Sequence, residues 1–230
     1  MMRKTIAPGL GVLLLLWSNP ARPEAAKVPS PFNCSVPCAI NLVGCADGAA
    51  DAAGLFTVTV RDLANNPKPY AVVVLDFTDV CNEVRVADTQ FAAGLVVDAP
   101  SHTVRTFTDN NGVATLCVMG AAPGSVAGGT SAGVKIFADG VLLTEGISHP
   151  PVSIGTYDLD GATGGGAAGV GPSDLSVWMG DAFTGYRARS DYDCADAGCA
   201  GNLGPADLSR WLKVFFAAHS ATNGAMLGCP

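Results

Sequence analysis

Short stretches of alternating hydrophobic and polar residues dominate the middle of the chain. Residues 56–61 alternate with a period of two and residues 71–77 are rich in β-branched side chains, and both patterns are typical of β-strands. Four more stretches of this kind lie at 103–108, 113–119, 134–138 and 141–144. Asn-Gly at 111–112 and Asp-Gly at 139–140 predict tight hairpins between neighbouring strands. The pattern therefore predicts a mainly β fold, with a β-sandwich over residues 51–149.

The pattern becomes helical after the His-Pro-Pro sequence at 149–151. Apolar residues recur with the spacing i, i+3, i+4, i+7, i+8 at Leu175, Trp178, Met179, Ala182 and Phe183, and again at Leu208, Trp211, Leu212, Phe215 and Phe216. Helices this short are not stable alone. We therefore expect the two apolar stripes to pack together, with Trp178 and Trp211 at the centre of a small core.

This helical region is an internal duplication. Residues 158–179 (copy one) and 191–212 (copy two) align without a gap at a period of 33 residues (191 − 158 = 33). Both copies carry Asp-x-Asp, then Gly-Pro, then Asp-Leu-Ser-x-Trp at the start of the expected helix. Chance does not produce that many identities, so each copy is one unit of a repeat in which an acidic loop leads into a helix.

The repeated unit resembles the duplicated calcium-binding loops of dockerin modules, which are relatives of the EF-hand. Closely spaced carboxylates in a tight loop supply the oxygen ligands that Ca²⁺ prefers. The candidate ligands are Asp158, Asp160 and Asp174 in copy one and Asp191, Asp193, Asp196 and Asp207 in copy two. In both copies the last carboxylate follows the first by 16 residues (174 − 158 and 207 − 191), which is longer than the spacing in a dockerin loop. Two alternatives stay open: a local Cys194–Cys199 disulfide in copy two, and aspartates that only cap the helices.

The same resemblance implies that the module docks to a protein partner or a cell-surface scaffold. In dockerins the residues just before the last ligand help to recognise the partner, and those positions here are Pro172, Ser173, Pro205 and Ala206. The middle of the chain resembles bacterial Ig-like repeats of the invasin and intimin kind, through residues 56–67 and 108–115. The expected fold is therefore a mainly β chain, an Ig-like β-sandwich followed by a small two-helix dockerin-like module.

The N-terminus has the layout of a bacterial-type secretory signal peptide. Residues 1–4 are basic, residues 6–17 are apolar, and residues 18–26 are polar and rich in Pro and Ala. The apolar stretch is too short for a comfortable membrane span. We expect a protein that is secreted or held at the cell surface, with no membrane span once the signal is removed. The expected organisation is a signal peptide at 1–26, a Cys- and Pro-rich lead-in at 27–50, the sandwich at 51–149 and the repeat module at 150–230.

Cysteine content and charge narrow the expected environment and partners. All eight cysteines follow the expected signal peptide, and in an oxidising compartment they are expected to form disulfides, although the spacing does not determine which pairs form. The net charge is −7 and only 14% of residues are charged. Such a chain lacks the clustered cations that nucleic acid or anionic lipid requires.

These features together predict a non-catalytic surface or structural protein. No pattern indicates a set of catalytic residues, so the repeat module is expected to dock or tether the protein, with calcium as the candidate ion. One alternative is an adhesin whose sandwich loops, around residues 79–101, bind carbohydrate or protein. Another is a small secreted hydrolase, for which the sequence offers no catalytic constellation.

Overall fold

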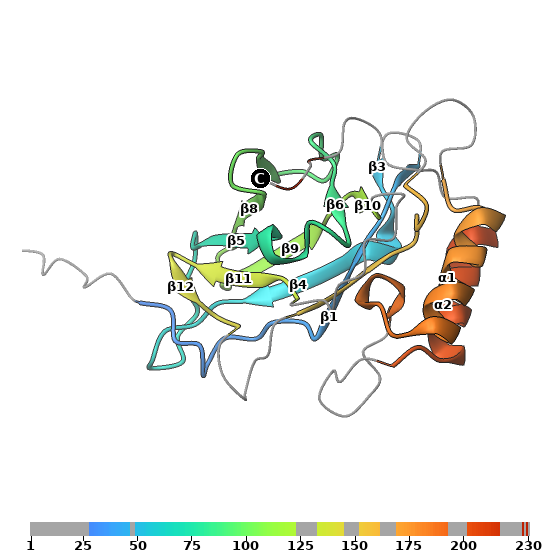
Figure 1. Cartoon of the computed structure of the whole chain (residues 1–230). Helices are drawn as coiled ribbons and strands as arrows, with labels where there is room; N and C mark the ends of the chain where they lie inside the picture. Colours follow the sequence, from blue (N-terminus) through green and yellow to red (C-terminus); the bar gives the residue numbers. More distant parts are fainter. Residues whose placement is uncertain are drawn as a thin grey trace, which may run out of the picture.

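Strands outnumber helices in the molecule, and two α-helices lie together at one end (Figure 1). The structure is a computed structural model, and it describes residues 28–46, 49–122, 133–144, 152–161, 169–192, 202–216, 227 and 229. The mainly β prediction is confirmed: a strand forms within each of the six stretches that the alternating pattern marked. The expected signal peptide lies outside the described residues.

The largest sheet has five strands in the order β12-β11-β5-β8-β7, and all neighbours are antiparallel. Its strands are β5 (Val72–Asp76), β7 (Val96–Asp98), β8 (Thr103–Phe107), β11 (Lys135–Ala138) and β12 (Val141–Leu142). In β5, Val73 and Leu75 are fully buried whereas the residues between them are half-buried, as a strand with one face on a core requires.

A second group of strands packs against this sheet. Strand β4 (Leu55–Thr59) pairs antiparallel with β9 (Val113–Cys117), and β1 (Ala39–Leu42) pairs in parallel with β13 (Ser153–Thr156). The inward side chains of both groups meet in one hydrophobic core. The remaining short elements are β2 (Cys45–Ala46), β3 (Ala49–Ala50), β6 (Arg85–Val86), β10 (Gly120–Ala121) and the 3₁₀ turns η1 (Ala52–Gly54), η2 (Thr78–Val80) and η3 (Ala188–Ser190).

The two predicted hairpins have different outcomes. Asp139 and Gly140 both have positive φ and join β11 to β12, as predicted. The hairpin predicted at 111–112 is wrong, because β8 belongs to the five-stranded sheet and β9 pairs with β4. Gly112 approaches the other layer so closely that a Cβ there would lie 2.5 Å from the carbonyl oxygen of Val60. The turn therefore carries the chain from one layer to the other.

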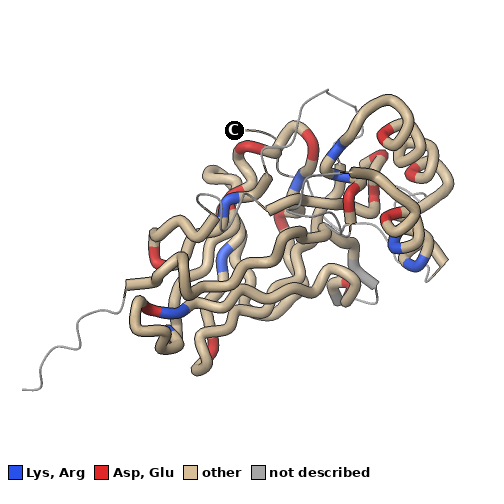
Figure 2. Tube along the Cα trace, turned by 90° about the horizontal axis from the view of Figure 1, so that it is seen from below, with Lys and Arg blue, Asp and Glu red and all other residues tan. Residues whose placement is uncertain are grey.

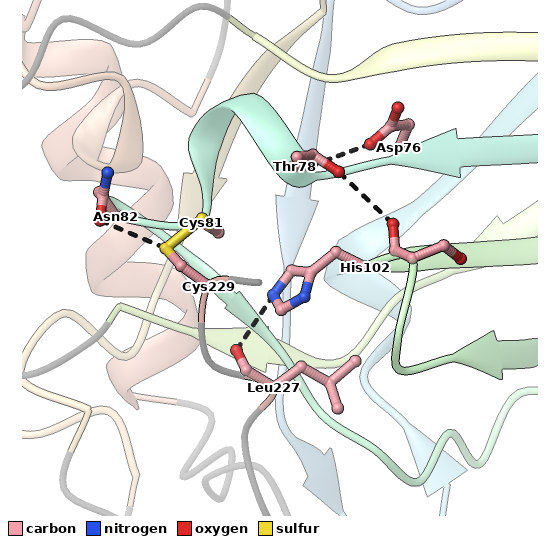
Figure 3. The surroundings of a disulfide bond; sticks show 8 residues. Asp76, Thr78, Cys81, Asn82, His102, Leu227 and Cys229 are labelled. Atoms are coloured by element: carbon pink, nitrogen blue, oxygen red, sulfur yellow. Dashed lines mark hydrogen bonds between the residues drawn. A yellow bond between two sulfur atoms is a disulfide. The ribbon is translucent and has the colours of Figure 1, made fainter.

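The C-terminal tail returns to the strands and is fixed there (Figure 3). Cys229 forms a disulfide with Cys81, which directly follows η2. Beside it, the N–H of Leu227 donates to the carbonyl oxygen of Val86 at 2.9 Å, and the buried ring of His102 lies 3.2 Å from the carbonyl oxygen of Leu227. The disulfide thus ties the end of the repeat region back to the strands, a pairing that the sequence left open.

Candidate metal centre in the duplicated helix pair

The repeat forms two helices with equivalent inner faces. Helix α1 spans Pro172–Thr184 and α2 spans Pro205–Phe216, each with its proline in the first turn where the missing N–H costs nothing. The buried positions are Asp174, Trp178 and Asp181 in α1 and Asp207, Trp211 and Val214 in α2. These positions correspond one to one at the period of 33, so the duplication extends to the three-dimensional structure.

The predicted apolar stripe is only partly buried. Trp178 and Trp211 share one hydrophobic cluster, as expected. Met179, Phe183 and Phe216 are exposed, Phe183 by 85% and Phe216 by 77%, so the prediction is wrong for these three. The reason is that each inner face begins at an aspartate and continues through the tryptophan at i+4, which turns the neighbouring apolar positions outward. Phe183 and Phe216 are equivalent in the repeat, so both copies present an aromatic side chain to solvent.

The two tryptophans connect the copies by reciprocal hydrogen bonds. The indole N–H of Trp178 donates to the carbonyl oxygen of Ser190 at 3.2 Å, and that of Trp211 donates to the carbonyl oxygen of Tyr157 at 3.1 Å. Each acceptor directly precedes the first aspartate of the other copy. The rings of Tyr157 and Tyr192 stack at 4.7 Å inside the same cluster. Each copy therefore completes the other, and the helix pair is one unit.

The last aspartate of each copy caps its own helix. Asp174 accepts the N–H groups of Leu159 and Asp160 on Oδ1, at 2.6 and 2.9 Å, and that of Gly171 on Oδ2 at 2.6 Å. In copy two, Asp207 accepts the N–H groups of Tyr192 and Gly204 at 2.7 and 2.9 Å. Both carboxylates are buried, and the bonds join the start of the acidic loop to the start of the helix. The capping role that the sequence left open is thus present in both copies.

Copy one also gathers three carboxylates at one point. Three carboxylate oxygens lie within 4.8 Å of one another, one each from Asp158, Asp160 and Asp174. Asp158 is 4% exposed; its Oδ1 accepts the N–H of Gly161 at 2.9 Å, whereas its buried Oδ2 has no hydrogen-bond partner. A buried carboxylate oxygen without a donor is costly unless a proton or a cation meets it. Such an oxygen fits an oxygen-preferring cation.

The electrostatics of copy one reflect the same crowding. Burial raises the pKa of Asp158 to about 7. The charge of Asp174, and the charge and side-chain hydrogen bond of Asp160, add to the shift, while the N–H of Gly161 opposes it. Burial also raises the pKa of Asp174, against the backbone N–H groups that its carboxylate accepts. Together the three acids concentrate negative charge around a buried oxygen.

Copy two differs at the equivalent of Asp158. The carboxylate of Asp191 is buried, and its Oδ2 accepts a hydrogen bond from the hydroxyl of Tyr186 at 3.2 Å. The other two candidate ligands of this copy, Asp193 and Asp196, lie outside the described residues, as does the Cys194–Cys199 pair. Only copy one therefore presents, within the described residues, a cluster of three acids that could hold a metal ion.

A buried ion pair beside copy one was missed by the sequence analysis. The guanidinium of Arg189 donates to both oxygens of Asp181 at 2.8 and 2.9 Å, and the hydroxyl of Ser190 donates to the same carboxylate at 2.7 Å. Arg189 and Asp181 are 2% and 4% exposed. The available signal was an aspartate one turn beyond Trp178 on the same helical face, where copy two has Val214.

The predicted partner-binding residues lie on the surface. Pro172 and Ser173 in α1 and Pro205 and Ala206 in α2 are all exposed in the first turns of their helices. Acidic residues gather around the helical end of the molecule (Figure 2). That these residues contact a partner stays a prediction.

Comparison with known proteins assigns no family. No protein-family model matches the chain, and no curated protein or solved structure is similar enough to count as a match. Within the described part of the chain, neither helix has the length and hydropathy needed to cross a membrane. The functional proposal must therefore come from the geometry of the repeat.

Proposed function

We propose that this chain is an exported, non-catalytic surface or structural protein whose C-terminal repeat pair is a calcium-stabilised docking module. The strands form the body, for which an Ig-like sandwich remains the proposed type. The observation that carries the proposal is the partnerless Oδ2 of Asp158, buried beside Asp160 and Asp174 at the base of a duplicated helix pair. Calcium fits because it accepts six to eight oxygen ligands in irregular arrangements.

The structure of copy one explains how an ion would act. Asp174 already joins the acidic loop to the first turn of α1 through Leu159, Asp160 and Gly171. A cation held by Asp158 and Asp160 beside this cap would neutralise the crowded carboxylates and tighten the same junction. Because Tyr157 accepts the indole N–H of Trp211, the effect extends to the helix of copy two.

Docking is supported by what the repeat leaves exposed. The first two residues of each helix and the equivalent side chains Phe183 and Phe216 face solvent, although each copy buries its tryptophan. Exposed aromatic side chains are characteristic of surfaces that bind proteins. The partner proposed here is a protein or a protein scaffold at the cell surface.

Thermal unfolding of the mature chain tests the calcium proposal. Extracellular calcium modules bind with Kd values of about 10⁻⁴–10⁻³ M, so about 2 mM calcium stabilises by roughly 0.6–1.8 kcal/mol over EGTA. For a chain of this size the melting temperature rises by about 1–7 °C. Asp158→Asn abolishes the rise and the matched variant Asp191→Asn keeps it. Equal melting temperatures in calcium and EGTA for the unaltered protein would refute the proposal.

A retention assay tests docking separately. The mature chain is immobilised and exposed to proteins released by the source cells, with calcium or with EGTA. The expected result is a retained protein that is lost in EGTA and lost with Ser173→Arg/Ala206→Arg, but kept with the control Ser176→Arg on the exposed side of α1. If every retained protein ignores the double variant, the first turns of the helices are not the docking surface.

A further inference from the structure

A pocket lies at the seam between the strands and copy two. Its volume is about 220 Å³, and its walls come from β1, the start of β4, Tyr192 and Arg210 of α2. It exists because the edge of β4 loses its neighbour there. Ser35 exchanges both backbone hydrogen bonds with Thr59, but Pro37 has no N–H with which to continue the ladder. The two chain segments separate beyond this point and leave the pocket between them.

Two polar side chains of the pocket converge on one backbone atom. The carbonyl oxygen of Tyr192 accepts Nη1 of Arg210 at 3.0 Å and Nδ2 of Asn41 at 3.2 Å. This shared acceptor holds both side chains in place before any ligand arrives. The other amide atom, Oδ1 of Asn41, lies instead against Gly155 of β13, which does not line the pocket. A pocket with a few convergent polar groups of this kind is typical of a binding site.

Arg210 gives the pocket a positive charge in an acidic protein. Among the described residues that line it, Arg210 is the only charged one. No acidic side chain in the described part of the chain forms an ion pair with its guanidinium. The helix pair does not need this cation, because copy one has Val177 at the equivalent position (210 − 33 = 177). The remaining guanidinium N–H groups are thus available to an anion.

The backbone of β1 adds further donors on the same side. On one side of β1, the N–H of Ser153 in β13 donates to the carbonyl oxygen of Cys38. On the other side, the N–H of Val43 donates to the carbonyl oxygen of Val118, and the carbonyl oxygen of Val43 accepts the N–H of Gly120. Since backbone groups alternate in direction along a strand, the N–H groups of Ala39 and Asn41 point away from β13. Gly54, which lines the pocket, lies on that side of β1, since a Cβ there would be 2.8 Å from the carbonyl oxygen of Asn41.

We propose that this pocket binds a small ligand through its carboxylate group, held by Arg210 and the β1 backbone. A guanidinium matches a carboxylate in shape and charge, and the net charge of −7 opposes anions of higher charge. The volume is below the roughly 300–1,000 Å³ of pockets for drug-sized molecules. The ligand is therefore about the size of one acidic sugar or the C-terminal residue of a peptide. The site is separate from the acids of copy one.

Isothermal titration of the mature chain in EGTA tests this pocket independently of calcium. The probes are D-glucuronate for an acidic sugar and N-acetyl-L-alanine for a peptide C-terminus, with D-glucose and N-acetyl-L-alanine amide as their uncharged counterparts. We expect D-glucuronate or N-acetyl-L-alanine to bind and its uncharged counterpart not to bind. The carboxylate that binds shows whether the natural ligand is an acidic sugar or a peptide C-terminus. Binding of neither carboxylate, or equal binding of a counterpart, would overturn the proposal.

Variants locate the binding in the pocket. Arg210→Gln is expected to weaken binding at least about tenfold, a loss of about 1.4 kcal/mol. The matched variant Lys213→Gln makes the same charge change on an exposed part of α2 outside the pocket and leaves affinity unchanged. Ala53→Leu enlarges an exposed residue of the pocket wall, so it also weakens binding even if Arg210→Gln does not fold. Full affinity in Arg210→Gln or in Ala53→Leu would contradict the assignment.

Discussion

The first aspartate of each repeat copy meets a different environment. In copy one, Asp158 keeps a buried oxygen without a partner beside two further acids, whereas in copy two Asp191 is satisfied by the hydroxyl of Tyr186. The frame around them is the same, since Asp174 and Asp207 cap their helices and each tryptophan bonds to the opposite copy. Duplication thus preserved the pairing of the helices and allowed the chemistry of the loops to diverge.

The inner faces of the helices diverged in the same way. At equivalent positions copy one buries Asp181, paired with Arg189, and copy two buries Val214. Copy one therefore depends on satisfied charges and copy two on apolar packing. The comparison shows that one helix frame can be completed by either kind of contact.

The largest expected effect comes from breaking the ion pair of copy one. Asp181→Ala removes the carboxylate that both nitrogens of the buried Arg189 bind, and should lower the free energy of unfolding by about 3–5 kcal/mol. Val214→Ala removes only apolar contacts and should cost about 2 kcal/mol. Chemical denaturation at neutral pH measures both. The double variant Asp181→Val/Arg189→Met should recover most of the loss; equal costs for the two single variants would contradict the distinction between the copies.

A smaller effect is expected from the cap that both copies share. Asp207→Ala leaves the N–H groups of Tyr192 and Gly204 without their acceptor, and should cost about 1–3 kcal/mol. The cost should be the same in calcium and in EGTA, because copy two is not the proposed ion site. Denaturation curves in the two buffers give the comparison. A cost that appears only in calcium would place an ion in copy two.

The smallest effect concerns pH and the carboxyl of Glu83, which interacts with the charges of Arg187, Arg189 and Asp181. Burial raises the pKa of Glu83, although Arg187 and Arg189 oppose the shift. Because the pKa of Glu83 is raised in the folded protein, its contribution to the free energy of unfolding is complete below the ordinary pKa of about 4.3. This contribution is lost as pH rises through the pKa of the folded state. Glu83→Gln should therefore flatten the decline of stability with pH in this window. Thermal unfolding from pH 4 to 7 checks this, and an unchanged profile would exclude Glu83 as its source.

The sequence was sufficient for features that depend on local pattern. The six predicted strands followed from local hydrophobic pattern, although β1, β7 and β13 were not predicted. The repeat followed from identities at a period of 33, which also placed Trp178 and Trp211 in one core. It failed where distant contacts decide. Phe183 was expected inside, but Asp174 and Asp181 occupy the inner face because backbone donors and Arg189 satisfy them.

Other features depend on contacts that no local pattern encodes. The turn at Gly112 looks like a hairpin in sequence, and only the pairing of β8 and β9 with different strands shows that it connects two layers. The Cys81–Cys229 bond spans 148 residues, so spacing gave no indication of it. The pocket beside Arg210 forms only where β1, β4 and α2 meet, and the sequence offered Arg210 merely as a departure from the repeat.

Equilibrium dialysis of the protein against radioactive calcium tests the proposed ion site most directly, because it measures bound calcium. The expected result is bound calcium that is lost in Asp158→Asn and retained in Asp191→Asn. Loss of binding in Asp191→Asn, unchanged binding in Asp158→Asn, or no bound calcium at millimolar concentration would contradict the claim that Asp158 anchors the ion site.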